Sequence, residues 1–155
     1  MRKTLPYLGA ENTLKYLKIQ VRESIPFVKN NFPILRSPAA IWNYCKPITT
    51  FQDDPPGSEF VMTVQSLFNP AINPHKFPGA GDCDDFTVLA LSCLFANGFK
   101  DNFACISGRS KKAPVHIYAA TRFNGKFIPI DLTNKKMIER SGYRYRQILP
   151  VKFTY

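Results

Sequence analysis

Three residues of this chain, Cys83, His116 and Asp131, have types and positions that suit nucleophilic chemistry. Cys83 follows a glycine-rich loop at the predicted start of a helix. Unpaired backbone N–H groups and the helix dipole at such a position stabilise a thiolate, so we expect a lowered thiol pKa. An imidazole beside the sulfur can accept its proton, and a carboxylate can fix the tautomer of that imidazole. The set therefore predicts a thiol that attacks a carbonyl carbon.

A predicted β-hairpin brings His116 and Asp131 together. Residues 115–120 and 126–131 have the apolar, β-branched and aromatic composition of strands. Asn124-Gly125 between them is a strong signal for a two-residue turn. A turn centred there places His116 almost opposite Asp131, with a small slip. Each of the three residues taken alone is more often structural, but the three in this order favour catalysis.

The clearest predicted helix spans residues 83–97. Asp82 is a favourable N-cap, Asp84 and Asp85 place negative charge in the first turn, and Gly98 suits the C-terminal end. The residues between are apolar nearly all round, which indicates a central, buried helix. Capping explains the three aspartates better than a cation site does.

The remaining segments predict an α+β domain, because helices precede a mostly antiparallel set of strands. Further helices are expected at 11–22, after Ser37 and at 59–67, loops at 51–58 and 69–82, and a strand at 103–107. We divide the chain into an N-terminal basic arm, 1–37, that is mobile or docks a partner, and a core, 38–155, with a basic C-terminal tail.

Three motifs of the chain resemble the transglutaminase-like cysteine protease superfamily, in particular its small bacterial and phage-borne members. The motifs are Gly81-Asp82-Cys83-Asp84-Asp85, Val115-His116-Ile117-Tyr118 and Ile130-Asp131-Leu132-Thr133. The segment 51–59 resembles the stretch that precedes the cysteine in such proteins. The resemblance covers about residues 38–135. It implies a papain-like, transglutaminase-core fold, in which the helix that starts at the cysteine packs on an antiparallel sheet.

The resemblance also implies roles for individual residues. Cys83 would be the nucleophile, His116 the general base and acid, and Asp131 the residue that orients the histidine. The oxyanion hole would use the backbone N–H of the nucleophile and a second donor upstream, for which Gln65 is the candidate side chain. A capping or surface role for Gln65 is the simpler alternative. We expect no cofactor and no metal ion, since the chain is too short for the calcium-binding insert of large animal transglutaminases.

The activity implied is that of a thiol enzyme that forms an acyl-enzyme on a peptide or isopeptide-type amide. Transfer to water makes it a cysteine protease or amidase, which we favour, and transfer to an amine makes it a transglutaminase. The expected partner is a peptide or protein substrate, cell-wall peptide included. A different class stays open: a non-catalytic structural or assembly protein, for example of a phage virion, that retains the fold and docks through its basic tail and N-terminal arm.

Composition indicates one folded domain and a basic surface. The chain has 155 residues, 45% of them hydrophobic, which suits a single core and argues against disorder. Lysine and arginine outnumber the acidic residues by 21 to 11, and residues 101–155 hold eleven basic and three acidic residues. This excess suits attraction to an acidic polymer. Arginine alternates with tyrosine at 140–146, as in some nucleic-acid-binding proteins, although a solvated strand face is the simpler interpretation.

The cysteines and the apolar pattern bear on location. The chain has four cysteines and no C-x-x-C pair, which argues against zinc-ribbon and thioredoxin-like sites. We expect reduced thiols, with Cys45, Cys93 and Cys105 acting as small buried apolar residues. No apolar run reaches the length of a membrane span and no signal peptide is evident, so a cytoplasmic or virion-associated protein is expected. His75 is expected to be exposed in its loop.

Overall fold

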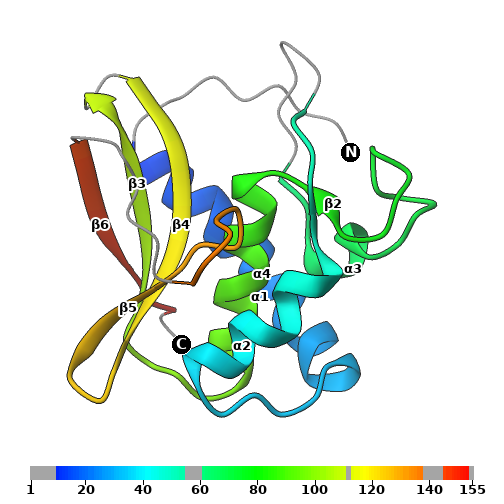
Figure 1. Cartoon of the computed structure of the whole chain (residues 1–155), viewed down its shortest axis with the longest axis horizontal. Helices are drawn as coiled ribbons and strands as arrows, with labels where there is room; N and C mark the ends of the chain where they lie inside the picture. The colour runs from blue at the N-terminus through cyan, green and yellow to red at the C-terminus, as the bar shows by residue number, and fades with distance from the viewer. Residues whose placement is uncertain (1–9, 55–60, 111–112, 138–144, 154–155) are drawn as a thin grey trace.

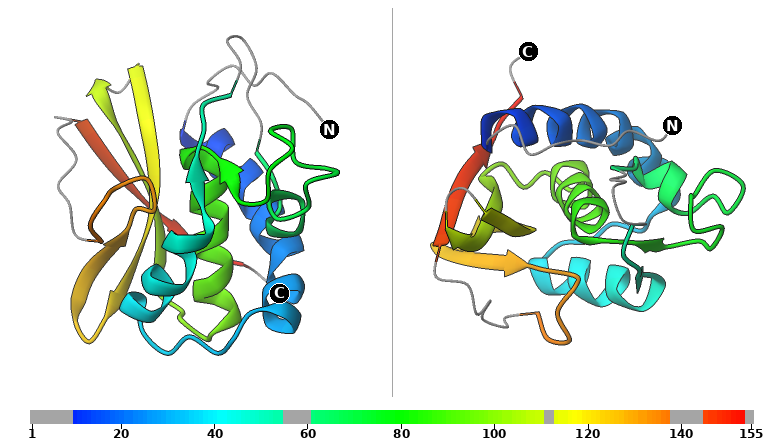
Figure 2. Two further views of the ribbon diagram at one scale, coloured as in Figure 1. Left: turned by 45° about the vertical axis from the view of Figure 1, so that its right-hand side comes forward. Right: turned by 90° about the horizontal axis from the view of Figure 1, so that it is seen from above.

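The computed structural model describes residues 10–54, 61–110, 113–137 and 145–153. A four-stranded sheet forms one side of the molecule and helices cover one of its faces (Figure 1). Helix α4 (Cys83–Ala96) lies in the centre, enclosed by the sheet, by α1 (Ala10–Asn31) and by α2 (Pro38–Cys45), as the view from above shows (Figure 2). The predicted α+β class is confirmed. None of the helices in these ranges is both long enough and apolar enough for a membrane crossing.

The sheet is antiparallel and contains the predicted hairpin. Its strands are β3 (Asn102–Ser110), β4 (Ala113–Phe123), β5 (Lys126–Ile130) and β6 (Tyr145–Val151), in the order β5-β4-β3-β6. The turn between β4 and β5 has positive φ angles at Asn124, 52°, and at Gly125, 76°. This is the conformation of the two-residue turn that asparagine and glycine favour, and it pairs Phe123 with Lys126 as predicted.

Strand β6 differs from the expected basic tail. Residues 145–151 pair with β3 along seven positions, from Asn102 opposite Val151 to Gly108 opposite Tyr145. Exposed and partly buried residues alternate along β6. From Tyr145 onward, this supports the interpretation that the basic stretch is the solvated face of a strand. Residues 140–144 lie outside the described ranges.

Helix α4 begins and ends close to the predicted residues. Asp82 is its N-cap, and the Asp85 carboxylate accepts a hydrogen bond from the Asp82 N–H at 3.1 Å, which completes a capping box. Gly98, with φ 84°, follows the helix. Most of the residues between are buried in one core with residues of α1, α2, α3 (Val64–Leu67) and the sheet: Phe86, Val88, Leu89, Ala90, Leu91, Cys93 and Leu94.

Helix α1 is longer than predicted and belongs to the same core. It runs from Ala10 to Asn31 and includes Pro26, whereas the sequence indicated a helix over 11–22. Leu17, Val21 and Val28 are buried against α4, because the apolar stripe of the helix continues beyond the proline. Residues 10–31 are therefore packed in place and are not the mobile arm that we expected. The division of the chain at residue 37 stays a prediction.

Two short parallel strands connect the helices to the start of α4. Strand β1 (Thr50–Phe51) pairs with β2 (Ala80–Gly81). The Gln52 N–H then donates to the Gly81 carbonyl at 2.8 Å, so the pairing continues toward the N-cap of α4. Just before β2, Gly79 has φ 84° and a Cβ there would lie 2.0 Å from the carbonyl oxygen of Ile48. Only glycine fits this crossing.

Candidate active site

His116 and Asp131 form a hydrogen-bonded pair, as the hairpin predicted. The His116 Nε2 and Asp131 Oδ2 atoms are 2.5 Å apart. The side chains are 13% and 5% exposed, respectively, so the contact is largely shielded from water. Ala119 lies opposite Ile130 at the end of β5. Asp131, the next residue, therefore projects on the same side of the hairpin as His116.

Two further residues hold Asp131 in place. Thr133 donates to Asp131 Oδ1 from its backbone N–H, at 3.2 Å, and from its hydroxyl, at 2.7 Å. The Lys46 ammonium donates to the Leu132 carbonyl at 2.6 Å and fixes the same turn. Burial lowers the pKa of Lys46 and the charge of Asp131 raises it. The Asp-x-Thr spacing could have indicated the first contact, because such turns form locally. Lys46 comes from a distant segment that carries no comparable signal.

Cys83 lies beside the backbone of the residue that follows His116. The Ile117 N–H donates a hydrogen bond to the Cys83 sulfur. The register of β4 and β5 leaves this N–H available to the sulfur. Ile130, the last residue of β5, pairs with Ala119 of β4, so Ile117 lies beyond the part of β4 that pairs with β5. The start of α4 occupies that position. The structure thus brings all three predicted residues to one place.

The hydrogen bond to Asp131 defines the role of each nitrogen of His116. A carboxylate accepts hydrogen bonds, so Nε2 carries the proton and Nδ1 keeps the lone pair. Nδ1 is therefore the nitrogen that can accept a proton from a thiol. The His116 ring also stacks on Tyr118, with the ring centroids 5.7 Å apart and the planes inclined by 26°. Both contacts restrict rotation of the imidazole.

The pKa of the Cys83 thiol is raised, which reverses the expectation of a lowered value. Burial is the largest cause, followed by the charges of Asp84 and Asp82. The hydrogen bond from Ile117 acts in the opposite direction but is outweighed. The helix dipole does not lower the pKa of this thiol below its ordinary value, because the aspartates in the cap and first turn of the helix place negative charge beside the sulfur. The resting group is a neutral thiol that needs a base at the moment of attack.

Gln65 is engaged elsewhere. It lies on α3 (Val64–Leu67), a shorter helix than the one predicted at 59–67, of which residues 59–60 are outside the described ranges. Its side-chain amide donates to the Glu23 carbonyl of α1 at 3.3 Å. The amide thus faces α1, and its role as an oxyanion donor stays a prediction.

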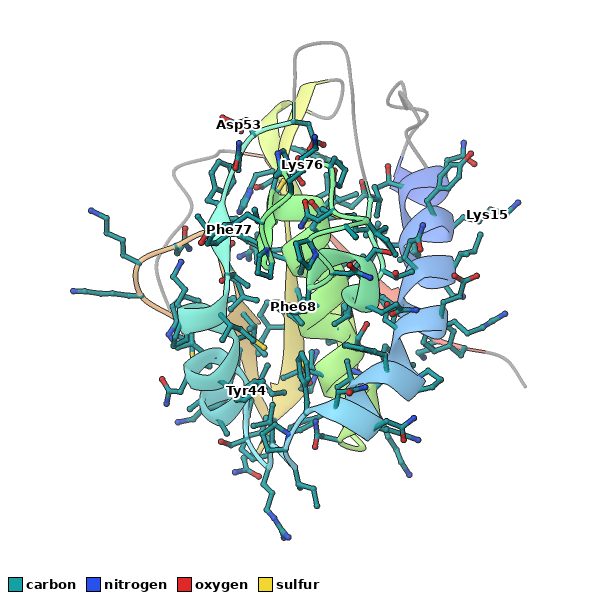
Figure 3. All side chains as sticks on the ribbon, turned by 90° about the vertical axis from the view of Figure 1, so that its right-hand side faces the viewer. Lys15, Tyr44, Asp53, Phe68, Lys76 and Phe77 are labelled. Atoms are coloured by element: carbon teal, nitrogen blue, oxygen red, sulfur yellow. The ribbon has the colours of Figure 1, made fainter. Side chains whose placement is uncertain are left out.

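The His75 side chain is buried, contrary to the expectation of an exposed loop residue. Its Nε2 lies 3.3 Å from Asp54 Oδ1, and both side chains are 5% exposed. The loop folds inward because the Asn73 amide donates to the carbonyls of Leu67 and Ala80, at 2.8 and 2.9 Å. Figure 3 shows the neighbouring residues Asp53 and Lys76 at the same end of the molecule. Nothing in the local sequence signalled this inward fold.

The other three cysteines lie in the interior of the protein. Cys45, Cys93 and Cys105 are free and fully buried, as predicted, and the sulfurs of Cys45 and Cys93 are 3.8 Å apart. Within the part of the chain that the structure describes, three or more metal-ligating side chains do not gather at any point.

Comparison with solved structures finds chains that are similar to this one. A candidate protease from Parabacteroides distasonis aligns with 96% of this chain and 30% of its own, with a TM-score of 0.50 and 14% identity. A candidate cysteine protease from Cytophaga hutchinsonii aligns with 96% of this chain and 49% of its own, with a TM-score of 0.48 and 12% identity. A TGase aligns with 90% of this chain and 38% of its own, with a TM-score of 0.40 and 13% identity. The chain spans about half, or less, of each of these longer proteins. No protein-family model matches the sequence, and no curated protein was found to match it.

The likeness to the Parabacteroides distasonis structure concerns the fold alone. The Parabacteroides distasonis structure shares the architecture of this chain over nearly its whole length. The chain thus has the α+β fold of that candidate protease, which agrees with the predicted fold class.

Proposed function

We propose that this protein is a thiol enzyme that cleaves a peptide or isopeptide-type amide through an acyl-enzyme on Cys83. The supporting observations are the hydrogen bond from the Ile117 N–H to the Cys83 sulfur and the 2.5 Å hydrogen bond between Asp131 and His116, the residue that precedes Ile117. A nucleophile, a base and an orienting carboxylate in this order are the parts that acyl transfer requires. Each is supplied by an element whose position the core fixes.

The reaction follows from the protonation states. His116 Nδ1 takes the proton of the Cys83 thiol as the sulfur attacks the carbonyl carbon of the amide. The imidazolium, stabilised by Asp131, then gives that proton to the leaving nitrogen, and the C–N bond breaks to leave a thioester. Water, deprotonated by the same imidazole, attacks the thioester and releases a carboxylic acid and the free thiol. A primary amine in place of water would give the transferase outcome.

Selective alkylation tests the nucleophile. We expect iodoacetamide to label Cys83 at least about tenfold faster than Cys45, Cys93 or Cys105, because only Cys83 is partly accessible and the proposed base, His116, acts on it. Labelled positions are read by peptide mass spectrometry after a short exposure. His116→Gln removes the base and should slow labelling of Cys83, whereas Cys105→Ser serves as a matched control and should leave it unchanged.

The same experiment separates the alternatives. Slow, equal labelling of all four thiols would contradict the enzyme proposal and favour the non-catalytic assembly protein. Labelling confined to Cys83 by a peptidyl chloromethyl ketone would extend the proposal from a reactive thiol to a peptide-binding site. Incubation of candidate peptides in ¹⁸O-water, with and without a primary amine, distinguishes hydrolysis from transfer by the mass of the product.

A further inference from the structure

A half-exposed aromatic side chain lies close to the start of α4, on the strand that pairs with the residues before the nucleophile. Phe51 of β1 is 52% exposed, and its backbone lies opposite Gly81, two residues before Cys83. Its ring meets the ring of Phe86 edge-on, with the centroids 6.4 Å apart and the planes inclined by 70°. Phe86 is only 2% exposed. Phe51 therefore packs on the core with one part of its surface and presents the rest to solvent.

The contact with Phe86 places Phe51 near the nucleophile. Cys83 and Phe86 are three residues apart on α4, and residues at this spacing are neighbours on the surface of a helix. Phe51 thus packs against the helix about one turn from Cys83, which is about 5 Å along the axis. An extended peptide rises about 3.3 Å per residue, so substrate residues within about three positions of the attacked carbonyl can reach the ring.

Further large apolar side chains are exposed on the two segments that lead into β1 and β2. They are Ile48, 38% exposed, Ile72, 57%, and Phe77, 55%. The two segments touch, because the backbone of Gly79 crosses closely over the Ile48 carbonyl, and the Phe77 carbonyl accepts the Ala80 N–H at 3.2 Å. Figure 3 shows Phe77 beside β1. Apolar side chains that are exposed on neighbouring segments are typical of a binding surface.

The position of His116 defines which part of a substrate meets this surface. His116 belongs to β4, and the sheet lies on one side of α4 while β1 and β2 lie on the other (Figures 1 and 2). The general acid gives its proton to the leaving nitrogen, so the leaving part of the substrate lies toward the sheet. The acyl part, on the N-terminal side of the cleaved bond, then extends across the start of α4 toward Phe51.

We propose that Phe51 is a specificity-determining residue, which selects peptides with a large apolar side chain in the acyl part, within about three residues of the cleaved bond. This inference rests on the proposed function, because it concerns the substrate of the same thiol. Contact with the ring removes apolar surface of both partners from water. Phe86 already restrains the ring, so binding costs little conformational freedom there.

The test compares tripeptidyl chloromethyl ketones that carry either phenylalanine or serine at the first, second or third residue from the reactive group. The Cys83 sulfur displaces chloride to form a thioether, the thiol proton passes to His116, and the peptide takes the place of the acyl part. Phenylalanine at one of these positions should raise the second-order rate of Cys83 modification about tenfold over serine. Mass spectrometry measures this rate on the unaltered protein. An advantage below about threefold at all three positions would overturn the proposal.

Variants of the full chain assign the preference to Phe51. Phe51→Thr keeps a strand-forming residue in β1 and should reduce the advantage of phenylalanine to less than about twofold, whereas Phe51→Leu keeps an apolar surface and should retain most of it. Ile34→Thr is the matched control and should keep the full preference. Ile34 is 76% exposed, and its neighbour Leu35 donates to the Asn97 side chain at the opposite end of α4. A wild-type preference in Phe51→Thr, with circular dichroism unchanged, would overturn the proposal.

Iodoacetamide separates this inference from the proposed function. It has no peptide part, so each chloromethyl ketone rate is divided by the iodoacetamide rate of the same variant, which corrects for any change in the thiol itself. If iodoacetamide does not select Cys83 over the buried thiols, the proposed function fails. If it selects Cys83 but phenylalanine gives no advantage, only the role of Phe51 fails.

Discussion

The two carboxylate oxygens of Asp131 accept hydrogen bonds from different residues, so a replacement of Asp131 tests which nitrogen of His116 carries the proton. Oδ2 accepts from His116, and Oδ1 accepts both donors of Thr133. In Asp131→Asn the two Thr133 donors select the amide oxygen, so the NH₂ group turns toward His116 Nε2. That nitrogen must then accept, the ring proton moves to Nδ1, and the base loses its lone pair.

We therefore expect Asp131→Asn to reduce the rate of Cys83 acylation by about 10³- to 10⁴-fold, the size of a tautomer defect in a catalytic triad. Single-turnover labelling with a peptidyl electrophile measures this rate. Thr133→Val removes only the hydroxyl donor and should cost about tenfold, because the backbone donor remains. A loss in Thr133→Val as large as that in Asp131→Asn, with the fold intact, would argue against this account of the tautomer.

At the scale of elements, the packing of α4 stabilises the fold, and the same helix carries Cys83 at its first residue. Leu89 is fully buried in the middle of the helix, six residues after Cys83. Leu89→Ala should lower the free energy of unfolding by about 2–5 kcal/mol, the usual cost of a large cavity in a core. Chemical denaturation followed by circular dichroism measures it. The matched change at the exposed Ile34, Ile34→Ala, should cost less than about 0.5 kcal/mol, and equal effects would contradict the enclosed position of α4.

Local patterns explain which elements the sequence could predict. Asn124-Gly125 fixes both the turn and the register of its hairpin, so the contact between His116 and Asp131 was predictable. The caps of α4, Asp82 and Gly98, are equally local. In contrast, β1 and β2 are two residues each, and their pairing joins segments about thirty residues apart. No periodicity marks such strands, and for that reason the buried pair of His75 and Asp54 was missed.

The thiol pKa was predicted with the wrong sign for a physical reason of the same kind. The start of a helix favours a thiolate when solvent or cations surround it. At Cys83 the outcome depends on burial under the sheet and on the acidic residues of the capping box. Burial is a property of the packed molecule, so the helix pattern alone could not supply it.

At the scale of the whole molecule, the raised pKa of Asp82 makes stability depend on pH. The folded value is about 7 and the ordinary value is 3.8. A carboxyl group with a raised folded pKa stabilises the fold at low pH, and this contribution is lost as the pH rises from about 4 to about 7. We expect the free energy of unfolding to fall by about 2–3 kcal/mol between about pH 5 and about pH 8 on account of this group, whose pKa is raised mainly by burial.

Urea denaturation at these two pH values tests the expectation, and Asp82→Asn is the reference in which this part of the dependence disappears. If the wild type and the variant lose stability equally between the two pH values, Asp82 does not titrate in this range. Ionisable groups that do not interact with Asp82 contribute the same background to both proteins, so the difference between them reports Asp82 together with Asp85, whose pKa the charge of Asp82 raises.

The enclosure of α4 has one more consequence. Because sheet, α1 and α2 surround this helix, its backbone cannot open to solvent without dissolving the packing of the entire protein. The sulfur at its first residue is consequently anchored to the most cooperative unit of the chain. On warming, the sulfur should keep its position until the whole molecule unfolds, and early fraying of a peripheral segment should not displace it.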